Sequence, residues 1–365
     1  MKYLVVGDTH FKVDNVEESE HFHLQVYRYL LDNKVDCIIL LGDLLHTHEK
    51  LFTFALNLAV KFITMCSSFA HTYCLVGNHD ATSNTIYCST NHWMNVLKNQ
   101  TNVTVVDKPT PVMLGPLGPL VLACPYVSDG RFVESLNEFA PGWQQANLIF
   151  AHQLFDGAKM GAIVSQGVEE WKLEWPQVIS GHLHDRQQPQ ANLYYTGSSQ
   201  QLAFTEKEDK SLALVSVSES ADDHNTTAKW TVKWTEVFLD IKHRKIIHAT
   251  VSELSTLVIP VSSDTTYKIV IQDDDASIKA FKKTERYKEL ENRAGVKSVQ
   301  FKVDKCGTVG VSAAMDTTTT DFVTQLMNNL SQLHGDDAYL ESYVKSIVLN
   351  RKEIDCSDKD VLLLH

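Results

Sequence analysis

The chain reads Tyr73-Cys74-Leu75-Val76-Gly77-Asn78-His79-Asp80 in its first quarter. An apolar run of this length is typical of a buried strand, and the glycine that ends it is followed at once by three polar side chains. The same arrangement recurs on both sides of this stretch within the first two hundred residues. Lys2–Gly7 leads into Asp8-Thr9-His10, Asp36–Leu41 into Gly42-Asp43, Asn147–Ala151 into His152, and Gln177–Ser180 into Gly181-His182-Leu183-His184.

Helical patterns separate these expected strands. Glu18–Asn33 carries apolar residues on one face, Leu51–Ser67 is mostly apolar, and Ile86–Leu97 follows the Gly77–Asp80 motif. Strands that alternate with helices indicate βαβ units and an α/β fold. Because sites in open α/β sheets form beyond the carboxyl ends of the strands, we expect the polar motifs to meet at one edge.

The polar residues at the strand ends are of the types that bind divalent metals. A two-metal centre needs several N and O ligands, with a carboxylate shared between ions ~3.5–4 Å apart. Aspartate, histidine and asparagine have the right hardness for Mn, Fe or Zn. His79 stays free to act on a substrate. The predicted ligands are Asp8, His10, Asp43, Asn78, His152, His182 and His184.

Each motif by itself has an ordinary structural explanation. Asp8-Thr9-His10 is a weak pattern, the residues of His182-Leu183-His184 alternate between strand faces, and a lone histidine such as His152 is more often structural. Gly77-Asn78-His79-Asp80 is far more specific, with three polar residues at a strand end. All five motifs in this order, each after a strand, predict a metal centre and exclude coincidence as the simpler explanation.

Composition limits the remaining possibilities. A chain of 365 residues predicts two or three units. The absence of a long apolar run and of a signal-peptide pattern predicts a cytoplasmic protein, in the host cell if a phage or virus encodes it, with no membrane partner. Seven cysteines without a C-x-x-C pair exclude a zinc ribbon and a thioredoxin-like site. The net charge of −12 opposes a broad nonspecific DNA-binding face.

The ordered motifs resemble those of the calcineurin-like metallophosphoesterases. Within that superfamily the chain resembles the SbcD-type DNA double-strand-break repair nucleases, which include the nuclease subunit of T-even phage recombination endonucleases. The narrower resemblance rests on His46, on Tyr195-Thr196-Gly197-Ser198, and on a later β-α-β pattern. It implies an α/β fold in which helices flank a metallophosphoesterase β-sandwich, with a small α/β capping domain and a short helical C-terminal tail.

The expected domains follow from this resemblance and from changes in composition. We expect a nuclease domain over residues 1–215 and connecting strands over residues 216–260, among them Trp230–Val237 and Lys245–Val251. A capping domain over residues 261–312 contains the strands Tyr267–Ile271 and Val296–Val303 around a mixed-charge helix, Ala276–Arg293. The C-terminal helices over residues 318–365 are Asp321–His334 and Asp337–Asn350.

The resemblance also implies roles for the site residues. Asp43 bridges the two ions; Asp8, His10 and His184 complete the first ion's shell, and Asn78, His152 and His182 the second's. Two Mn²⁺ ions are expected, with Fe²⁺, Mg²⁺ and Zn²⁺ as alternatives. His79 is the candidate general acid or transition-state stabiliser. Asp80 either orients His79 or caps a following helix. His46 positions the scissile strand. His48 is a weaker candidate for a role in the site.

Partners are implied in the same way. The nuclease acts on DNA with a separate SMC-like coiled-coil ATPase, because this chain has no G-x-x-x-x-G-K-[ST] loop. The C-terminal helices either contact that ATPase or pack on their own cap. A homodimer would form through Leu51–Met65 or Ile86–Leu97. The basic candidates for DNA contact are sparse: Lys12, Arg131, Arg186, Lys282 and Lys283, the last two on a mixed-charge helix that is more often a solvated face.

The favoured function is therefore a Mn-dependent DNA exonuclease and endonuclease of recombination or repair. One alternative is a metallophosphoesterase that acts on small phosphodiesters or phosphoproteins. Another, of a different class, is a noncatalytic scaffold that keeps the fold. A scaffold would be expected to lack a ligand or His79, and this sequence retains all of them.

Overall fold

The computed structural model describes residues 1–304 apart from 49, 114–117, 221–229 and 261. Its first sheet has the order β14-β13-β1-β2-β3-β4. The four strands β1 to β4 run parallel; β13 pairs antiparallel with β1, and β14 pairs antiparallel with β13 at the edge of the sheet. The bounds are β1 Lys2–Val6, β2 Cys37–Leu40, β3 His71–Leu75, β4 Val103–Val106, β13 Leu212–Glu219 and β14 Trp230–Val237.

A second six-stranded sheet has the order β11-β12-β10-β7-β6-β5. Its central strands β6, β7, β10 and β12 are parallel. The bounds are β5 Thr110–Pro111, β6 Val121–Ala123, β7 Leu148–Ala151, β10 Gln177–Ser180, β11 Gln187–Gln190 and β12 Leu193–Tyr195; a small hairpin, β8 Lys159–Met160 with β9 Ile163–Val164, lies between β7 and β10 in sequence.

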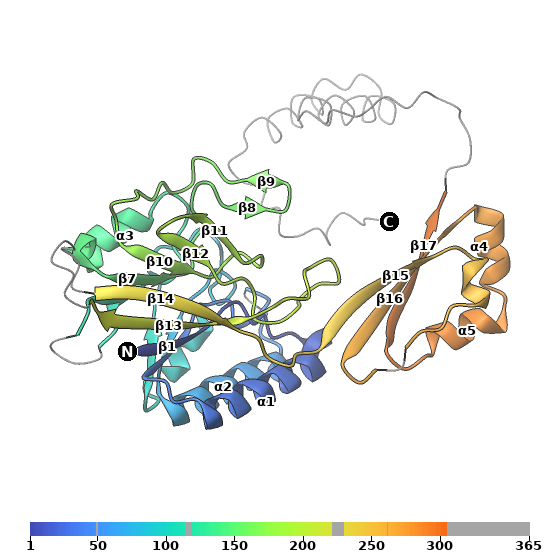
Figure 1. The fold of residues 1–365 in the computed structure, drawn as a ribbon, viewed down its shortest axis with the longest axis horizontal. Coiled ribbons are helices and arrows are strands. Elements are labelled where there is room, and N and C mark those ends of the chain that lie inside the picture. Colours follow the sequence, from blue (N-terminus) through green and yellow to red (C-terminus); the bar gives the residue numbers. More distant parts are fainter. Residues whose placement is uncertain (49, 114–117, 221–229, 261, 305–365) are drawn as a thin grey trace, which may run out of the picture. The chain divides into compact units, whose positions relative to one another are not determined.

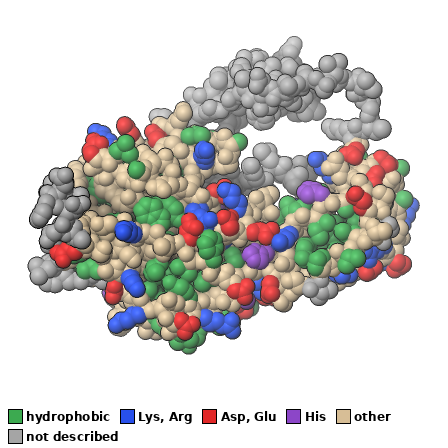
Figure 2. Space-filling view, viewed as in Figure 1, with side chains coloured by type: hydrophobic (Ala, Val, Ile, Leu, Met, Phe, Trp, Pro, Cys, Tyr) green, Lys and Arg blue, Asp and Glu red, His purple; other side chains and the backbone are tan. Residues whose placement is uncertain are grey.

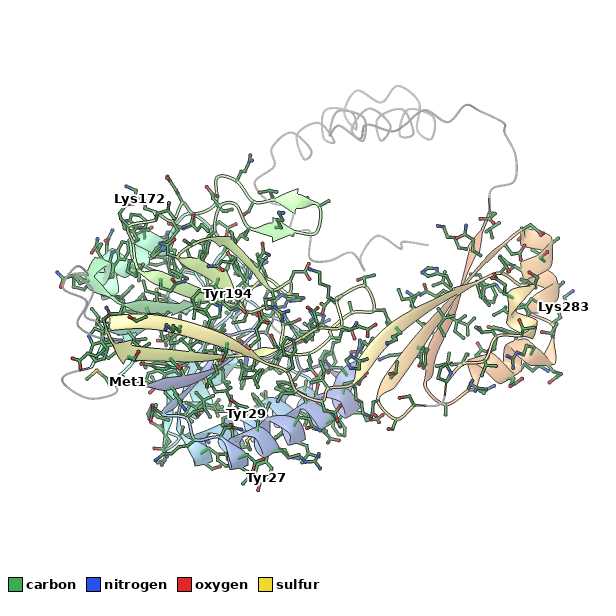
Figure 3. All side chains as sticks on the ribbon, viewed as in Figure 1. Met1, Tyr27, Tyr29, Lys172, Tyr194 and Lys283 are labelled. Atoms are coloured by element: carbon green, nitrogen blue, oxygen red, sulfur yellow. The ribbon has the colours of Figure 1, made fainter. Side chains whose placement is uncertain are left out.

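The two sheets pack face to face, and helices cover their outer faces (Figure 1). The apolar layer between the sheets includes Tyr3 and Ile39 from the first and Phe150 and Ile179 from the second. The ring of Tyr194 in β12, labelled in Figure 3, lies against the ring of Trp234 in β14, and the ring centroids are 5.0 Å apart. The predicted β-sandwich is confirmed.

Amphipathic helices complete the outer layers. The long helices α1 (Val16–Asp32) and α2 (Thr53–Phe69) lie side by side and bury their apolar faces against the first sheet. On the second sheet, α3 (Phe132–Phe139) packs with a cluster of aromatic residues. None of the helices in the described part of the chain is both long and apolar enough for a membrane span.

The C-terminal described residues form a three-stranded parallel sheet. β15 (His243–Ala249), β16 (Thr265–Asp273) and β17 (Val296–Val303) pair in that order, and α4 (Asp275–Phe281) and α5 (Glu285–Glu291) pack on the sheet. Asp274 caps α4 by accepting the backbone N–H of Ser277, and Thr284 caps α5 in the same way with Tyr287.

The structure corrects three expectations about these elements. β15, expected among the connecting strands, pairs with β16 in the C-terminal sheet, and β14 belongs to the first sheet. The single helix predicted over Ala276–Arg293 is two helices, because Thr284 starts a new one. Ile86–Leu97 is largely irregular, with one short 3-10 helix, η2 (Trp93–Leu97). The helices expected within residues 318–365 lie outside the described residues.

Short 3-10 segments complete the described elements: η1 Val13–Asn15, η3 Trp143–Gln145 and η4 Glu253–Ser255. The expected strands that lead into the five polar motifs are present as β1, β2, β3, β7 and β10, each almost wholly buried. Strands covered on both faces are continuous apolar runs, which is the pattern that the sequence shows. The motifs therefore begin at the carboxyl ends of parallel strands.

Candidate metal centre

The carboxyl ends of β1, β2, β3, β7 and β10 bring the predicted ligands into two adjoining groups. Asp8, His10 and His184 offer ligand atoms that all lie within 4.8 Å of one another. Asp43, His152 and His182 form a second such group. The two groups come from both sheets of the sandwich, so neither sheet could build the site without the other.

Asp43 stands between the two groups. Its Oδ2 lies 3.5 Å from Nε2 of His10 and 3.3 Å from Nε2 of His152, one histidine from each group. Its Oδ1 accepts the backbone N–H of His79 at 2.9 Å. One carboxylate oxygen that faces both groups is the geometry that a bridging ligand requires.

Asn78 presents its amide oxygen to the second group. Oδ1 lies 3.1 Å from Nε2 of His152 and 3.0 Å from Nδ1 of His182. The amide nitrogen donates to Oδ1 of Asn84 at 3.0 Å, which fixes the orientation of the amide. The oxygen is thereby turned toward the imidazoles as a neutral ligand.

Several ligand residues have unusual backbone conformations. His10, Asp43 and His182 have φ values of 42°, 50° and 79°, a region that residues other than glycine rarely adopt. Such conformations persist only where surrounding contacts hold them, and they concentrate at functional sites. Here the contacts include Asp8, which accepts the backbone N–H of His182 with both oxygens.

The charges at the centre are set by burial and by mutual attraction. Burial raises the pKa of Asp8, and the attraction of His152 only partly offsets this rise. Burial also acts to raise the pKa of Asp43, but His152, His79 and His10 outweigh it and hold that pKa well below its ordinary value. For His152, burial is outweighed by Asp43 and Asp8, so its pKa is raised to about 9. A divalent cation would therefore displace a proton here.

The donor set fits two divalent cations. It consists of two carboxylates, one amide oxygen and four imidazoles, and five of the seven residues are buried. Nδ1 of His152 is held by the carbonyl of Leu41 at 2.7 Å, so that Nε2 faces the centre. Mixed N and O ligands of this kind suit Mn, Fe or Zn.

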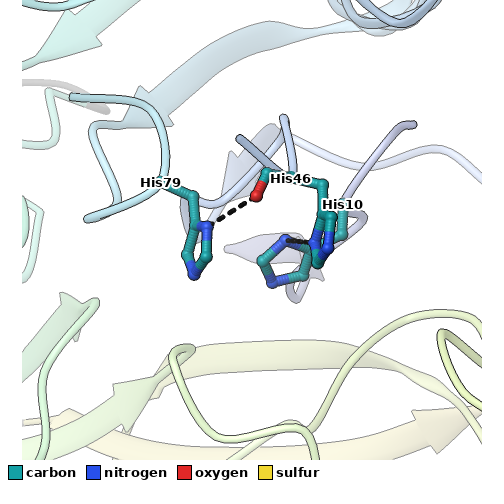
Figure 4. A group of neighbouring side chains, drawn as sticks. All are labelled: His10, His46 and His79. Carbon is teal, nitrogen blue, oxygen red and sulfur yellow. Dashed lines mark hydrogen bonds between the residues drawn. The ribbon is translucent and has the colours of Figure 1, made fainter. Parts of the chain in front are cut away.

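Three further histidines, His46, His48 and His79, line the exposed side of the centre, and Figure 4 shows His46 and His79 beside His10. The ring of His79 lies 4.9 Å from that of His10, and its Nδ1 bonds the carbonyl of His46 at 2.7 Å. Nδ1 of His46 lies 3.4 Å from Nδ1 of His10. His48 stacks on His79 at 4.5 Å and bonds the carbonyl of Asn78 at 2.9 Å, so it too belongs to the site.

Asp80 has a different place from the one expected. Its buried carboxylate accepts the backbone N–H groups of Leu44, Leu45 and Gly77 and the indole N–H of Trp93, at 2.9–3.2 Å for the shortest bond to each. No helix follows directly for it to cap. Asp80 therefore ties the two loops that carry Asp43 and Asn78 together, and it does so through backbone groups.

The predicted DNA-contact residues are mostly paired with acids. Arg131 pairs with Glu134 at 2.7 Å, Lys12 with Asp14 at 3.6 Å, and Arg186 with Asp209 at 2.8 Å and Glu236 at 3.1 Å. Lys282 lies over the ring of Phe301. Lys283 lies on the outer side of the α4–α5 segment (Figure 3).

Glu206 is a site residue that the sequence did not single out. Its Oε1 lies 3.0 Å from Nδ1 of His184. Burial acts to raise the pKa of Glu206, but His184 and Lys210 outweigh it and lower that pKa to about 2. No pattern in the sequence marks this residue, because Glu206-Lys207-Glu208-Asp209-Lys210 has the composition of a solvated charged loop.

Residues 1–186 match the calcineurin-like phosphoesterases. The chain belongs to the calcineurin-like phosphoesterase family. It is 41% identical over 283 residues to "Putative phosphoesterase 244L" of Invertebrate iridescent virus 6, covering 77% of this chain and 97% of the relative. It is 35% identical to "Putative phosphoesterase 078R" of Invertebrate iridescent virus 3, covering 79% of this chain and 80% of the relative.

Among solved structures, a phosphoesterase from E. coli, Yfce, is 12% identical, with a TM-score of 0.27 over 59% of this chain and 87% of its own. Membership of the calcineurin-like phosphoesterase family confirms the expectation of a metal-dependent phosphoesterase. The family binds divalent metals, and the two groups of ligand atoms described above are where this calcineurin-like phosphoesterase could hold them.

Proposed function

We propose that this phosphoesterase is a Mn²⁺-dependent DNA nuclease, with exonuclease and endonuclease activity, that hydrolyses phosphodiester bonds at a two-metal centre. The observation that carries the hydrolytic part is the position of His79 beside the paired ligand groups. The DNA substrate is supported by the resemblance of the ordered motifs to SbcD-type nucleases and by the C-terminal three-stranded sheet with its two helices.

The ligand assignment within this proposal follows the two groups. Asp8, His10 and His184 would hold one ion, His152, His182 and Asn78 the other, and Asp43 both. When bound, two divalent cations polarise a phosphodiester and acidify the attacking water.

His79 supplies the remaining chemistry of the reaction. Its Nδ1 is engaged with the carbonyl of His46, so Nδ1 is the donor in that bond and Nε2 is left for the substrate. An alkoxide leaves when the phosphodiester is cut, and it needs a proton or a positive neighbour. Stacking on His48, at 4.5 Å, keeps the ring of His79 at the edge of the centre. His79 would therefore donate to the leaving oxygen from Nε2.

One observation favours a second candidate, a phosphoesterase for small phosphodiesters or phosphoproteins. Lys12, Arg131 and Arg186 are ion-paired, and on the face shown in Figure 2 acidic and basic side chains are interspersed. DNA binding usually depends on a continuous basic surface. A small substrate would need only the metal centre and the surrounding histidines.

The test compares DNA and small-diester hydrolysis by the same protein. The wild type is incubated with Mn²⁺ and either end-labelled linear duplex DNA or a chromogenic phosphodiester. His79→Asn should lower turnover of both about 100-fold or more while Mn²⁺ binding is retained. His71→Asn, at the opposite end of β3, is the matched control and should behave as wild type.

The outcomes separate the candidates. DNA cleavage by the wild type and by His71→Asn, but not by His79→Asn, supports the nuclease. Hydrolysis of the small diester without DNA cleavage, also after addition of the ATPase subunit, would favour the second candidate. Mn²⁺ binding without turnover of either substrate would leave only a noncatalytic scaffold.

The proposed function includes two protein partners, an ATPase subunit and a second copy of this chain. We propose an SMC-like coiled-coil ATPase as a separate subunit for DNA recombination or repair; the segments expected to contact it lie outside the described residues. A homodimer through α2 is also proposed. Leu51, Phe52 and Phe54 at the start of that helix are 46–69% exposed, an unusual exposure for large apolar side chains at neighbouring positions.

A further inference from the structure

The two ring nitrogens of His184 face different partners. Nε2 points into the metal centre, 3.1 Å from Nε2 of His10. Nδ1 lies 3.0 Å from Oε1 of Glu206, a carboxylate on the loop that follows β12. A carboxylate accepts but cannot donate, so Nδ1 carries the proton in this bond and Nε2 is left with its lone pair toward the centre.

We propose that Glu206 is a positioning residue that fixes the tautomer and ring orientation of His184 for one of the two metal ions. The inference rests on the proposed metal centre. Ligating histidines commonly donate their second N–H to a carboxylate, which orients the ring and makes the metal-binding nitrogen more basic. Nothing in the motif pattern contains Glu206, because it follows His184 by 22 residues on another loop.

Glu206 is itself held rigidly. Its side chain is 13% exposed, and Oε2 accepts Nζ of Lys210 at 2.9 Å and the backbone N–H of Leu202 at 3.0 Å. Lys210, only 5% exposed, also donates to the carbonyl of His184 at 3.0 Å and to Ser198 at 2.8 Å. The ion pair therefore holds both the ring and the backbone of His184.

The other histidines of the centre have partners of a different kind. His152 is fixed by a backbone carbonyl, and Nδ1 of His10 faces His46. A change at Glu206 should thus affect the ion held by Asp8, His10 and His184 more than the ion held by His152 and His182. This selectivity distinguishes a positioning role of Glu206 from a general loss of protein stability, which would lower the affinity for both ions.

The experiment measures Mn²⁺ binding to the full chain by equilibrium dialysis, with electron paramagnetic resonance to detect the coupled ion pair. Wild type should bind two ions. Glu206→Gln keeps the size of the side chain. It should lower the affinity for one Mn²⁺ ion about 10–100-fold and leave the affinity for the other unchanged. Glu208→Gln, two residues away and paired with Lys245 at the surface, is the matched control and should bind as wild type.

Two further variants keep the test decisive. Because Glu206→Gln leaves Lys210 buried without its partner, Glu206→Gln with Lys210→Met removes both charges and should show the same selective loss. In a His184→Asn background, Glu206→Gln should add no further loss, since Glu206 acts through His184.

Specific results would overturn the inference. Two ions bound by Glu206→Gln with wild-type affinity would do so, as would equal weakening of both ions or additive losses in the His184→Asn background. A wild-type protein that binds no Mn²⁺ would overturn the metal centre itself, and the inference with it. Each of these patterns differs from the expected loss of a single ion.

Discussion

At the scale of single residues, the centre depends on how closely two loops approach. Gly77 leads into Asn78 and packs directly on Asp43: a Cβ atom at position 77 would lie 2.2 Å from Oδ1 of Asp43 and 2.3 Å from its backbone nitrogen. No side chain fits there. The bridging position of Asp43 therefore requires the absence of a side chain on the neighbouring loop.

We expect Gly77→Ala to displace Asp43. The added methyl group should lower the free energy of unfolding by about 1–3 kcal/mol, as overpacking does, and weaken Mn²⁺ binding at both positions at least tenfold. Gly167→Ala is the control, because its Cβ would meet no atom within 4 Å although its φ is +71°. It should cost some stability and leave Mn²⁺ affinity unchanged. Unchanged Mn²⁺ affinity in Gly77→Ala would contradict the close-packing argument.

At the scale of elements, the segment between β3 and β4 forms little helix, and side-chain hydrogen bonds and ion pairs hold it in place. Trp93, the first residue of η2, donates to Asp80 at 2.9 Å. The two ends of η2 are attached to Asp107, which bonds Nζ of Lys98 at 2.6 Å and lies 3.4 Å from Nε2 of His92. The irregular segment is thus anchored to the loops of the metal centre on one side and to β4 on the other.

This anchor predicts a pH dependence of stability. Burial acts to raise the pKa of Asp107, but Lys98 and His92 outweigh it and hold that pKa below its ordinary value of 3.8. A depressed carboxyl pKa stabilises the fold above pH 3.8, and this contribution is lost as the pH falls below that value. Asp107→Asn should lower the free energy of unfolding by about 1 kcal/mol at pH 7 and by progressively less below pH 3.8.

Urea unfolding of the metal-free protein at several pH values measures this effect. Asp32→Asn, at the exposed end of α1, serves as the control and should show no such convergence with wild type at low pH. A stability difference for Asp107→Asn that is constant from pH 7 to pH 3 would contradict the prediction.

At the scale of the whole molecule, a buried arginine joins the C-terminal sheet to the sandwich within the described residues. Arg244 in β15 is 4% exposed and bonds Oε1 of Glu18 in α1 at 3.1 Å. It also donates to the carbonyl of Leu202, and its backbone N–H to the side chain of Gln201. Leu202 in turn donates to Glu206. The loop that positions His184 is therefore the same loop that receives the first strand of the C-terminal sheet.

Arg244→Met should destabilise the protein by about 3 kcal/mol, because it leaves the largely buried carboxylate of Glu18 without its partner. The double variant Arg244→Met with Glu18→Gln should recover part of this loss. Urea unfolding monitored by tryptophan fluorescence gives both values. If the loss of unfolding free energy in the double variant equals the sum of the losses in the two single variants, the ion pair is not what joins these elements.

The sequence by itself determined the α/β fold and which strand ends carry the candidate ligands. Strands buried on both faces are continuous apolar runs, and polar residues directly after them, such as Asp8, Asn78 and His152, can only lie at the carboxyl edge of a parallel sheet. The helix predicted over Ile86–Leu97 from its apolar residues was wrong, because those residues pack into the core without forming a regular helix.

Only the tertiary structure decided which distant side chains support the centre. Glu206 and Lys210 lie in a charged run that resembles a solvated loop, and Asp80 acts through backbone groups that no side-chain pattern reveals. The alignment of β15 with β16 in a separate sheet likewise depends on contacts far apart in sequence. Local patterns encode strands and their ends, whereas hydrogen bonds between loops are fixed only when the two sheets pack against each other.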